Sequence, residues 1–169
     1  MRLLLALLFP TMLHAQAPLD RQLIAAADRG DAARVKKLIA QGANVNAKDE
    51  KQDSAFLIAS ANGHTEVVKL ALVAGADLKS TNRYGGTGLI PACHHGHLET
   101  VRLLLTTKID VNHVNRLGWT ALLEAVVLGN GGPNHTAIVA ALVKAGADPN
   151  VKDRQRMTAL AHARQRGYG

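Results

Sequence analysis

The sequence predicts an all-α solenoid of about five stacked helix–turn–helix units joined by short extended turns. The first observation is a fixed period of 33 residues: the opening Ser54-Ala55-Phe56 returns as Thr87-Gly88-Leu89 and again as Thr120-Ala121-Leu122. The second is a composition of 47% hydrophobic but only 3% aromatic residues, which suits short helices packed closely through Ala, Leu, Val and Ile. Because each unit covers its apolar face only with the next one, such an array leaves a long open surface.

The repeat divides the chain into units. We predict that residues 1–17 are a cleavable signal peptide and that residues 18–169 form the repeat domain, with units at 19–48, 49–81, 82–114, 115–152 and a truncated last unit at 153–169. The step from Thr120 to Thr158 exceeds the period by five residues, which fall at Asn130-Gly131-Gly132-Pro133-Asn134. This string of Gly, Pro and Asn predicts an inserted surface loop at 130–134.

The N-terminus has the organisation of an export signal. Arg2 supplies a positive charge, residues 3–9 form a short apolar run, Pro10 ends it, and Ala15 or Ala17 offers a small-residue cleavage site. The run is much shorter than the ~20 residues that span a bilayer, so membrane insertion of the mature chain is not expected. We therefore predict a periplasmic or secreted protein cleaved after Ala15 or Ala17. The alternative is a disordered start retained in the cytosol.

Each unit is predicted to contain two helices. In the second unit, Ser54 is expected to cap the first helix and Gly63 to end it in a left-handed conformation. Thr65 is expected to cap the second helix, which Gly75 ends. Small residues recur in the first helices and should let neighbouring units approach closely, at Ala26, Ala59, Ala92, Ala125 and Ala163.

Three strings carry a family resemblance. They are Gly-Trp-Thr-Ala-Leu at 118–122, Asn-Gly-His-Thr-Glu-Val-Val-Lys-Leu at 62–70 and Ala-Gly-Ala-Asp-Pro-Asn at 145–150, and together they resemble ankyrin repeats. The resemblance implies β-hairpin-like fingers between the units and a concave face, made by fingers and first helices, that binds other proteins. With its export signal the chain is similar to small exported ankyrin proteins of Gram-negative bacteria. Some of these are linked to periplasmic stress defence, including support of catalase activity, and others are thought to neutralise toxic effectors.

The third unit departs from the family pattern in two places. Pro91 lies inside its first helix and removes one backbone hydrogen bond at the first turn, so we expect a local distortion and not the loss of the helix. Lys108 stands where the pattern has glycine after the second helix. A lysine in a left-handed conformation would be strained there, so we expect this turn to differ in shape from those of the other units.

A histidine cluster allows two interpretations. His94, His95 and His97 lie within four residues, a density that could hold zinc or copper. Alternatively, His97 belongs to a repeated Gly-His turn, shared in phase by His64 and His135, in which the imidazole braces backbone groups. His94 and His95 would then lie at the exposed end of a first helix, on the side that contacts partners.

The finger tips are the main candidates for partner contact. Trp, Tyr and Arg are the side chains most often found as binding hot spots, and several lie at finger positions by repeat phase. For Trp119 the alternative is packing between adjacent fingers, and for Tyr84 and the arginines it is plain solvent exposure. The predicted contact residues, with the two histidines included, are Lys51, Asp53, Arg83, Tyr84, His94, His95, Arg116, Leu117, Trp119, Leu128 and Arg154.

The chain contains no motif that indicates an enzyme or a cofactor. The single cysteine, Cys93, excludes an intramolecular disulfide and is expected to be a buried, inert thiol. The net charge of +7 favours a partner protein with an acidic surface, while the scattered basic residues do not indicate nucleic acid. The sequence thus predicts a non-enzymatic protein–protein interaction module of the periplasm, acting in oxidative stress defence. The alternatives are an immunity protein that neutralises a delivered toxin and a metal-binding protein that uses His94 and His95; the oligomeric state is left open.

Overall fold

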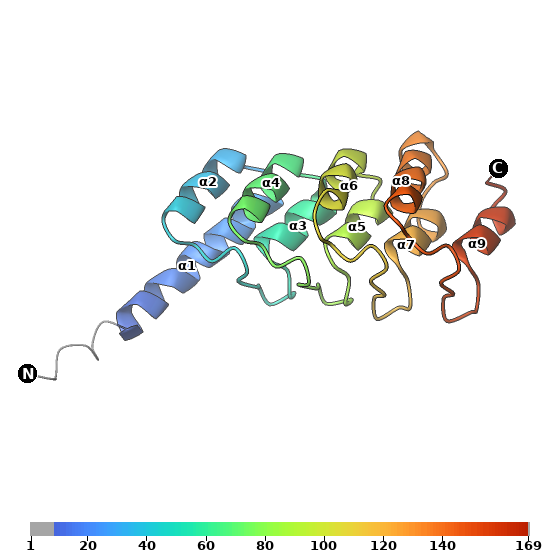
Figure 1. Ribbon diagram of the computed structural model, residues 1–169. Helices are drawn as coiled ribbons and strands as arrows, with labels where there is room; N and C mark the ends of the chain where they lie inside the picture. The colour runs from blue at the N-terminus through green and yellow to red at the C-terminus, as the bar shows by residue number, and fades with distance from the viewer. Residues whose placement is uncertain (1–8, 169) are drawn as a thin grey trace, which may run out of the picture.

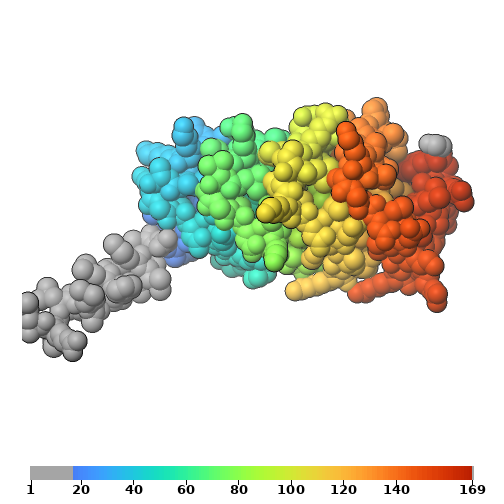
Figure 2. Space-filling view, viewed as in Figure 1, coloured from blue at the N-terminus to red at the C-terminus, as the bar shows by residue number. Residues whose placement is uncertain are grey.

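The computed structural model describes residues 9–168, which form helix pairs stacked side by side (Figure 1). The inner helices are α1 (Phe9–Asp28), α3 (Ala55–Asn62), α5 (Leu89–His94), α7 (Ala121–Val127) and α9 (Ala159–Gln165); the outer helices are α2 (Ala32–Ala40), α4 (Thr65–Val73), α6 (Leu98–Leu105) and α8 (Pro133–Lys144). The two sets form two layers, and extended fingers project beyond the inner layer (Figure 1). The units follow one another along the molecule in chain order (Figure 2). The predicted all-α repeat fold is confirmed.

Helix α1 crosses the predicted boundary between the signal peptide and the repeat domain. It begins at Phe9, contains Pro18 and ends at Asp28. The positive start and most of the apolar run lie outside the described residues, so the signal peptide stays a prediction. None of the helices in residues 9–168 combines the length and the apolar character that crossing a bilayer requires.

Side-chain hydroxyls cap most of the inner helices. Ser54 Oγ accepts a hydrogen bond from the Leu57 N–H at 3.3 Å, and Thr120 Oγ1 accepts one from the Leu123 N–H at 3.2 Å. At the other end of α3, Gly63 adopts φ +73° and closes the helix. These contacts satisfy N–H groups that have no partner within the helix, which explains the Ser or Thr that precedes α3, α7 and α9.

One local prediction was wrong, and another was confirmed only in part. Thr65 does not cap α4: His64 occupies the cap position, and Thr65 is the first helical residue, with its hydroxyl 2.7 Å from that of Thr100. Lys108 does not adopt a positive φ. The turn after α6 instead closes through Thr107, whose hydroxyl accepts a hydrogen bond from the Ile109 N–H at 3.2 Å. The turn thus differs in shape from the glycine turns of the neighbouring units, as predicted, but without the strain expected at Lys108.

Pro91 distorts the start of α5, as predicted. In the fourth unit, the Thr120 carbonyl accepts a hydrogen bond from the Glu124 N–H. Pro91 occupies the position equivalent to Glu124 and has no N–H to donate to the Thr87 carbonyl. The Ile90 N–H bonds the Thr87 carbonyl instead, at 3.2 Å. That N–H is therefore not available to the Thr87 side chain, whose hydroxyl is buried and has no hydrogen-bond partner among the described residues.

The same substitution before α5 and before α7 should have different effects on stability. We expect Thr120→Val to lower the free energy of unfolding by about 1 kcal/mol or more, because it removes a working cap. Thr87→Val should be neutral or stabilising, because it removes a buried hydroxyl that makes no hydrogen bond. Urea unfolding followed by circular dichroism measures both. An equal loss in the two variants would contradict the described backbone arrangement around Pro91.

Histidines lock successive outer helices onto the preceding unit. Each ring donates a hydrogen bond of 3.0 Å from Nε2 to a backbone carbonyl: His64 to Asp28, His97 to Ala61 and His135 to His94. Each ring also lies against a glycine turn of the preceding unit, at Gly30, Gly63 and Gly96 respectively. The predicted bracing role of these histidines is confirmed.

The last unit makes the equivalent contact with different residues. Arg166 Nη1 donates to the Val127 carbonyl at 2.6 Å, and the Tyr168 hydroxyl donates to the Gly129 carbonyl at 3.0 Å. The Tyr168 ring lies against Gly131 in the inserted loop, which is shorter than predicted because Pro133 and Asn134 already belong to α8. The described C-terminal residues thus brace α9 against the fourth unit without a second helix.

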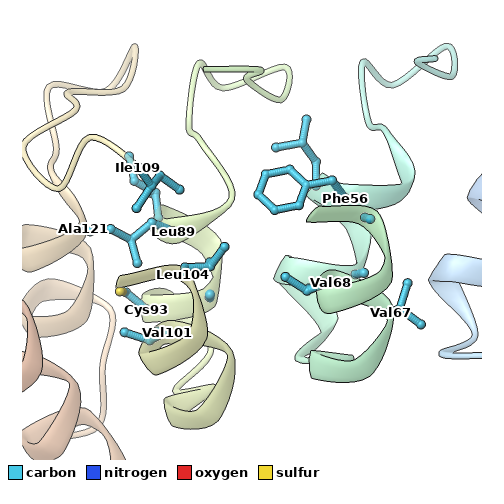
Figure 3. Close-up of a cluster of buried hydrophobic side chains, with 14 of the residues drawn as sticks. Phe56, Val67, Val68, Leu89, Cys93, Val101, Leu104, Ile109 and Ala121 are labelled. Atoms are coloured by element: carbon cyan, nitrogen blue, oxygen red, sulfur yellow. The ribbon is translucent and has the colours of Figure 1, made fainter. Parts of the chain in front are cut away.

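Buried aliphatic side chains form one continuous core along the stack. Leu89 and Leu104 of the third unit and Phe56 and Val68 of the second are fully buried in it (Figure 3). Cys93 lies in the same core, and burial, followed by the charge of Glu124, raises the pKa of its thiol far above the usual range. The thiol therefore stays protonated and buried, as predicted.

Candidate functional site

Each finger is closed by an Asp or Asn at its base. In the third unit, Asn82 Oδ1 accepts hydrogen bonds from the N–H groups of Tyr84 (2.9 Å) and Gly86 (3.0 Å), while the Asn82 N–H donates to the Gly86 carbonyl. Asp49, Asn115 and Asp153 make the corresponding contacts in the other fingers. The fingers are therefore hairpin-like tight turns. Within residues 9–168, Lys152 and Thr158 form an isolated strand-type bridge.

Neighbouring fingers are joined by arginines. The Arg116 N–H donates to the Tyr84 carbonyl at 2.9 Å, and its guanidinium donates to the Arg83 carbonyl at 3.1 Å. The Arg154 guanidinium donates in the same way to the Arg116 carbonyl. These bonds fix the spacing of the finger tips, so Arg116 and Arg154 act within the stack.

A groove of about 370 Å³ lies between the fingers and the inner helices of the second to fourth units. Its walls come from the fingers of the second, third and fourth units, and its floor comes from α5 and α7. It gathers most of the predicted contact residues: Asp53, Arg83, Tyr84, His94, His95, Leu117 and Leu128. We call it the concave groove.

The remaining predicted contact residues do not line the concave groove. Lys51 is exposed at the tip of the second unit's finger. Trp119 is half-buried and packs against the core, which favours the packing interpretation for this ring. Arg116 and Arg154 bond neighbouring fingers as described above.

The rim of the groove exposes large apolar side chains. Tyr84 is 51% exposed, Leu117 45% and Leu128 42%. Beside them, the Arg83 guanidinium lies 4.7 Å from the centre of the Tyr84 ring and 3.6 Å from Asp53 Oδ2. Exposed apolar side chains around a concave floor are the surface type that partner proteins cover.

Sequence reasoning missed the buried carboxylate of the groove. Glu124 lies in α7 and is 5% exposed. Its Oε1 accepts a hydrogen bond of 3.0 Å from Asn115 Nδ2, which ties the base of the fourth unit's finger to α7. In the following unit, Asp153 and His162 occupy the positions equivalent to Asn115 and Glu124. Asp153 Oδ2 lies 2.7 Å from His162 Nε2. A charge in the otherwise apolar run Ala121–Val127 is the signal that could have found it.

The two groove histidines stack on each other. The ring centres of His94 and His95 are 4.3 Å apart and the rings nearly parallel. Burial lowers the pKa of both imidazoles. The charge of His135 lowers the pKa of His94 further, and the charge of His94 lowers the pKa of His95 further. Both rings are therefore neutral at pH 7. Among residues 17–168, whose side chains the structure describes, no three His, Cys, Asp or Glu side chains converge as a metal ion would require. The metal-binding hypothesis thus has no ligand set in the described chain.

Comparisons with known proteins agree with this geometry. A family model described as ankyrin repeats (3 copies) matches residues 23–115 and 56–153. The crystal structure of an ankyrin repeat domain from Acinetobacter baumannii AYE is similar, with 55% identity and a TM-score of 0.84 over 86% of this chain and 74% of that one. The ankyrin repeat protein EF0377 is 40% identical, with a TM-score of 0.81 over the same shares of the two chains. No curated protein matches.

Proposed function

Because the chain belongs to the ankyrin repeat family, whose repeats mediate protein–protein interaction, we propose that it is a non-enzymatic binding module whose concave groove holds a partner protein. The observation that carries the proposal is the groove itself, which brings together predicted contact residues from three successive units. Three exposed apolar side chains stand at its rim, where a partner would bury them.

We also propose where the protein is located and in which process it acts. The short apolar run and small-residue cleavage site at the N-terminus support export to the periplasm, where the module would protect or support its partner in oxidative stress defence. The net charge of +7 would attract an acidic partner from a distance. Fractionation of cells that express the full chain tests the location, because a cytosolic, uncleaved product would contradict export.

Truncating two side chains of the rim should strongly reduce partner capture. We expect the double variant Tyr84→Ala/Leu117→Ala to retain at least about tenfold less partner than the wild type, because buried hot-spot side chains contribute about 2 kcal/mol each. The measurement is affinity capture from periplasmic extract at moderate salt, with bound proteins identified and quantified by mass spectrometry.

The matched control is Val73→Ala. Val73 is 85% exposed at the end of α4 in the outer layer, so its truncation removes an exposed apolar side chain far from the groove. It should capture partner as the wild type does, and all variants should keep their helical circular dichroism. Undiminished capture by the Tyr84/Leu117 variant would exclude the concave groove as the binding face.

A further inference from the structure

The concave groove differs in charge from the chain as a whole. The protein carries a net charge of +7, yet the ionisable residues that line the groove are Asp53, Glu124, Arg83 and the pair His94 and His95. Since both imidazoles are neutral at pH 7, two carboxylates face one guanidinium there. The lining is therefore locally acidic.

The acidic site is centred on Glu124. Its Oε1 accepts the hydrogen bond from Asn115, while its Oε2 lies 3.5 Å from His94 Nδ1. The Glu124 side chain is more than nine-tenths buried. Burial raises the pKa of its carboxyl group, and the hydrogen bond from Asn115 opposes that rise. A buried carboxylate without a cation is unfavourable, so this position gains most from a positive charge brought by a ligand.

The cation of the lining is engaged elsewhere. Arg83 forms its ion pair with Asp53 at 3.6 Å and lies over the Tyr84 ring, on the finger side of the groove. No lysine or arginine is among the residues that surround Glu124 in the groove apart from Arg83. In the next unit, Asp153 Oδ2 lies 2.7 Å from His162 Nε2, closer than the 3.5 Å between Glu124 Oε2 and His94 Nδ1.

Resting on the proposed function, we propose that the partner docks by inserting a basic side chain, arginine or lysine, into the concave groove to pair with Glu124. The apolar rim of Tyr84, Leu117 and Leu128 accommodates the methylene stem, as long basic side chains commonly pack theirs on apolar surface. The long-range attraction of an acidic partner by the whole chain is compatible with this local contact. A hydrogen-bonded charge pair in a desolvated groove determines specificity more than overall affinity.

The test uses a random peptide library displayed on phage and selected on the immobilised full chain. Groove-binding peptides are those lost on the Tyr84→Ala/Leu117→Ala variant, and their dissociation constants are then measured by fluorescence anisotropy. We expect enrichment of Arg or Lys at one peptide position, and about tenfold weaker binding to Glu124→Gln. Glutamine keeps the shape and the Asn115 contact, so this variant tests the charge and not the fold.

Two controls separate pairing from general electrostatics. Glu66→Gln makes the same charge change on the exposed first turn of α4 and should leave binding unchanged. A peptide with citrulline in place of the selected arginine, or acetyl-lysine in place of lysine, should bind the wild type as weakly as Glu124→Gln does, with no further loss on that variant. Groove-binding peptides without a selected basic residue, or equal binding to Glu124→Gln, would overturn this inference alone. A library that yields no peptide dependent on Tyr84 and Leu117 would overturn the proposed function as well.

Discussion

Gly63→Ala is expected to lower the free energy of unfolding by about 3 kcal/mol, well beyond the ~1 kcal/mol that a left-handed alanine costs by itself. Gly63 adopts φ +73°, and a Cβ added there would lie 2.6 Å from Cγ of the His97 ring. The ring would have to move, and its 3.0 Å hydrogen bond to the Ala61 carbonyl would be lost. The alanine therefore disrupts the contact between the second and third units.

Gly75 provides the matched control within the same unit. It has φ +86°, and a Cβ placed on it would meet no atom within 4 Å. Gly75→Ala should therefore cost only the backbone term, about 1 kcal/mol. Urea unfolding of both variants measures the difference between them. If the two glycines cost the same, the histidine–glycine contact does not hold the units together.

The second large effect on the free energy of unfolding is expected at Phe56 and Gly88, where a large side chain in one unit packs against a missing side chain in the next. Where α7 and α9 begin with alanine, the third unit has Gly88, and a Cβ there would lie 2.9 Å from Ser60 Oγ and 3.0 Å from the Phe56 ring. Where the third unit has Leu89, the second has the larger Phe56, which is fully buried (Figure 3). We expect Gly88→Ala to cost about 2 kcal/mol by overpacking and Phe56→Leu about 1 kcal/mol through the cavity that it leaves.

The double variant Phe56→Leu/Gly88→Ala should recover most of this loss. It restores the leucine–alanine combination that Leu89 and Ala121 already make in the next pair of units. We expect a favourable coupling of at least about 1.5 kcal/mol in the double-mutant cycle, as for residues in direct contact. Additive losses would show that the phenylalanine ring and Gly88 are energetically independent.

The period made the fold predictable because every unit contacts mainly its neighbours. Features that recur at the period of 33 residues, such as the Ser54 cap and the hydrogen-bonded ring of His97, can be predicted for every unit once they are recognised in one. The N-terminal cap of α4 was assigned to the wrong residue because His64 and Thr65 are adjacent and both suit the N-terminus of a helix. The backbone places His64 at the cap, and its ring reaches back to the preceding unit.

The site was predictable only in part. The repeat phase placed Tyr84 and Leu117 on fingers and His94 on an inner helix, and the structure brings all three to the concave groove. The sequence does not show that Arg116 bonds the neighbouring finger, since this depends on the distance between finger tips. Glu124 was missed because its charge, although it interrupts an apolar helix, does not recur in phase with the repeat, and its partner Asn115 lies in a finger.

Site-directed photo-crosslinking tests most directly whether the concave groove is the binding face. A benzoylphenylalanine residue is placed at position 117, on the groove rim, or at position 73, on the outer layer, and each protein is illuminated with the captured partner. Leu117 and Val73 are both exposed, so chemistry alone does not favour either position. The groove account predicts a covalent adduct from position 117 and none from position 73. An adduct from position 73 with none from position 117 would contradict it.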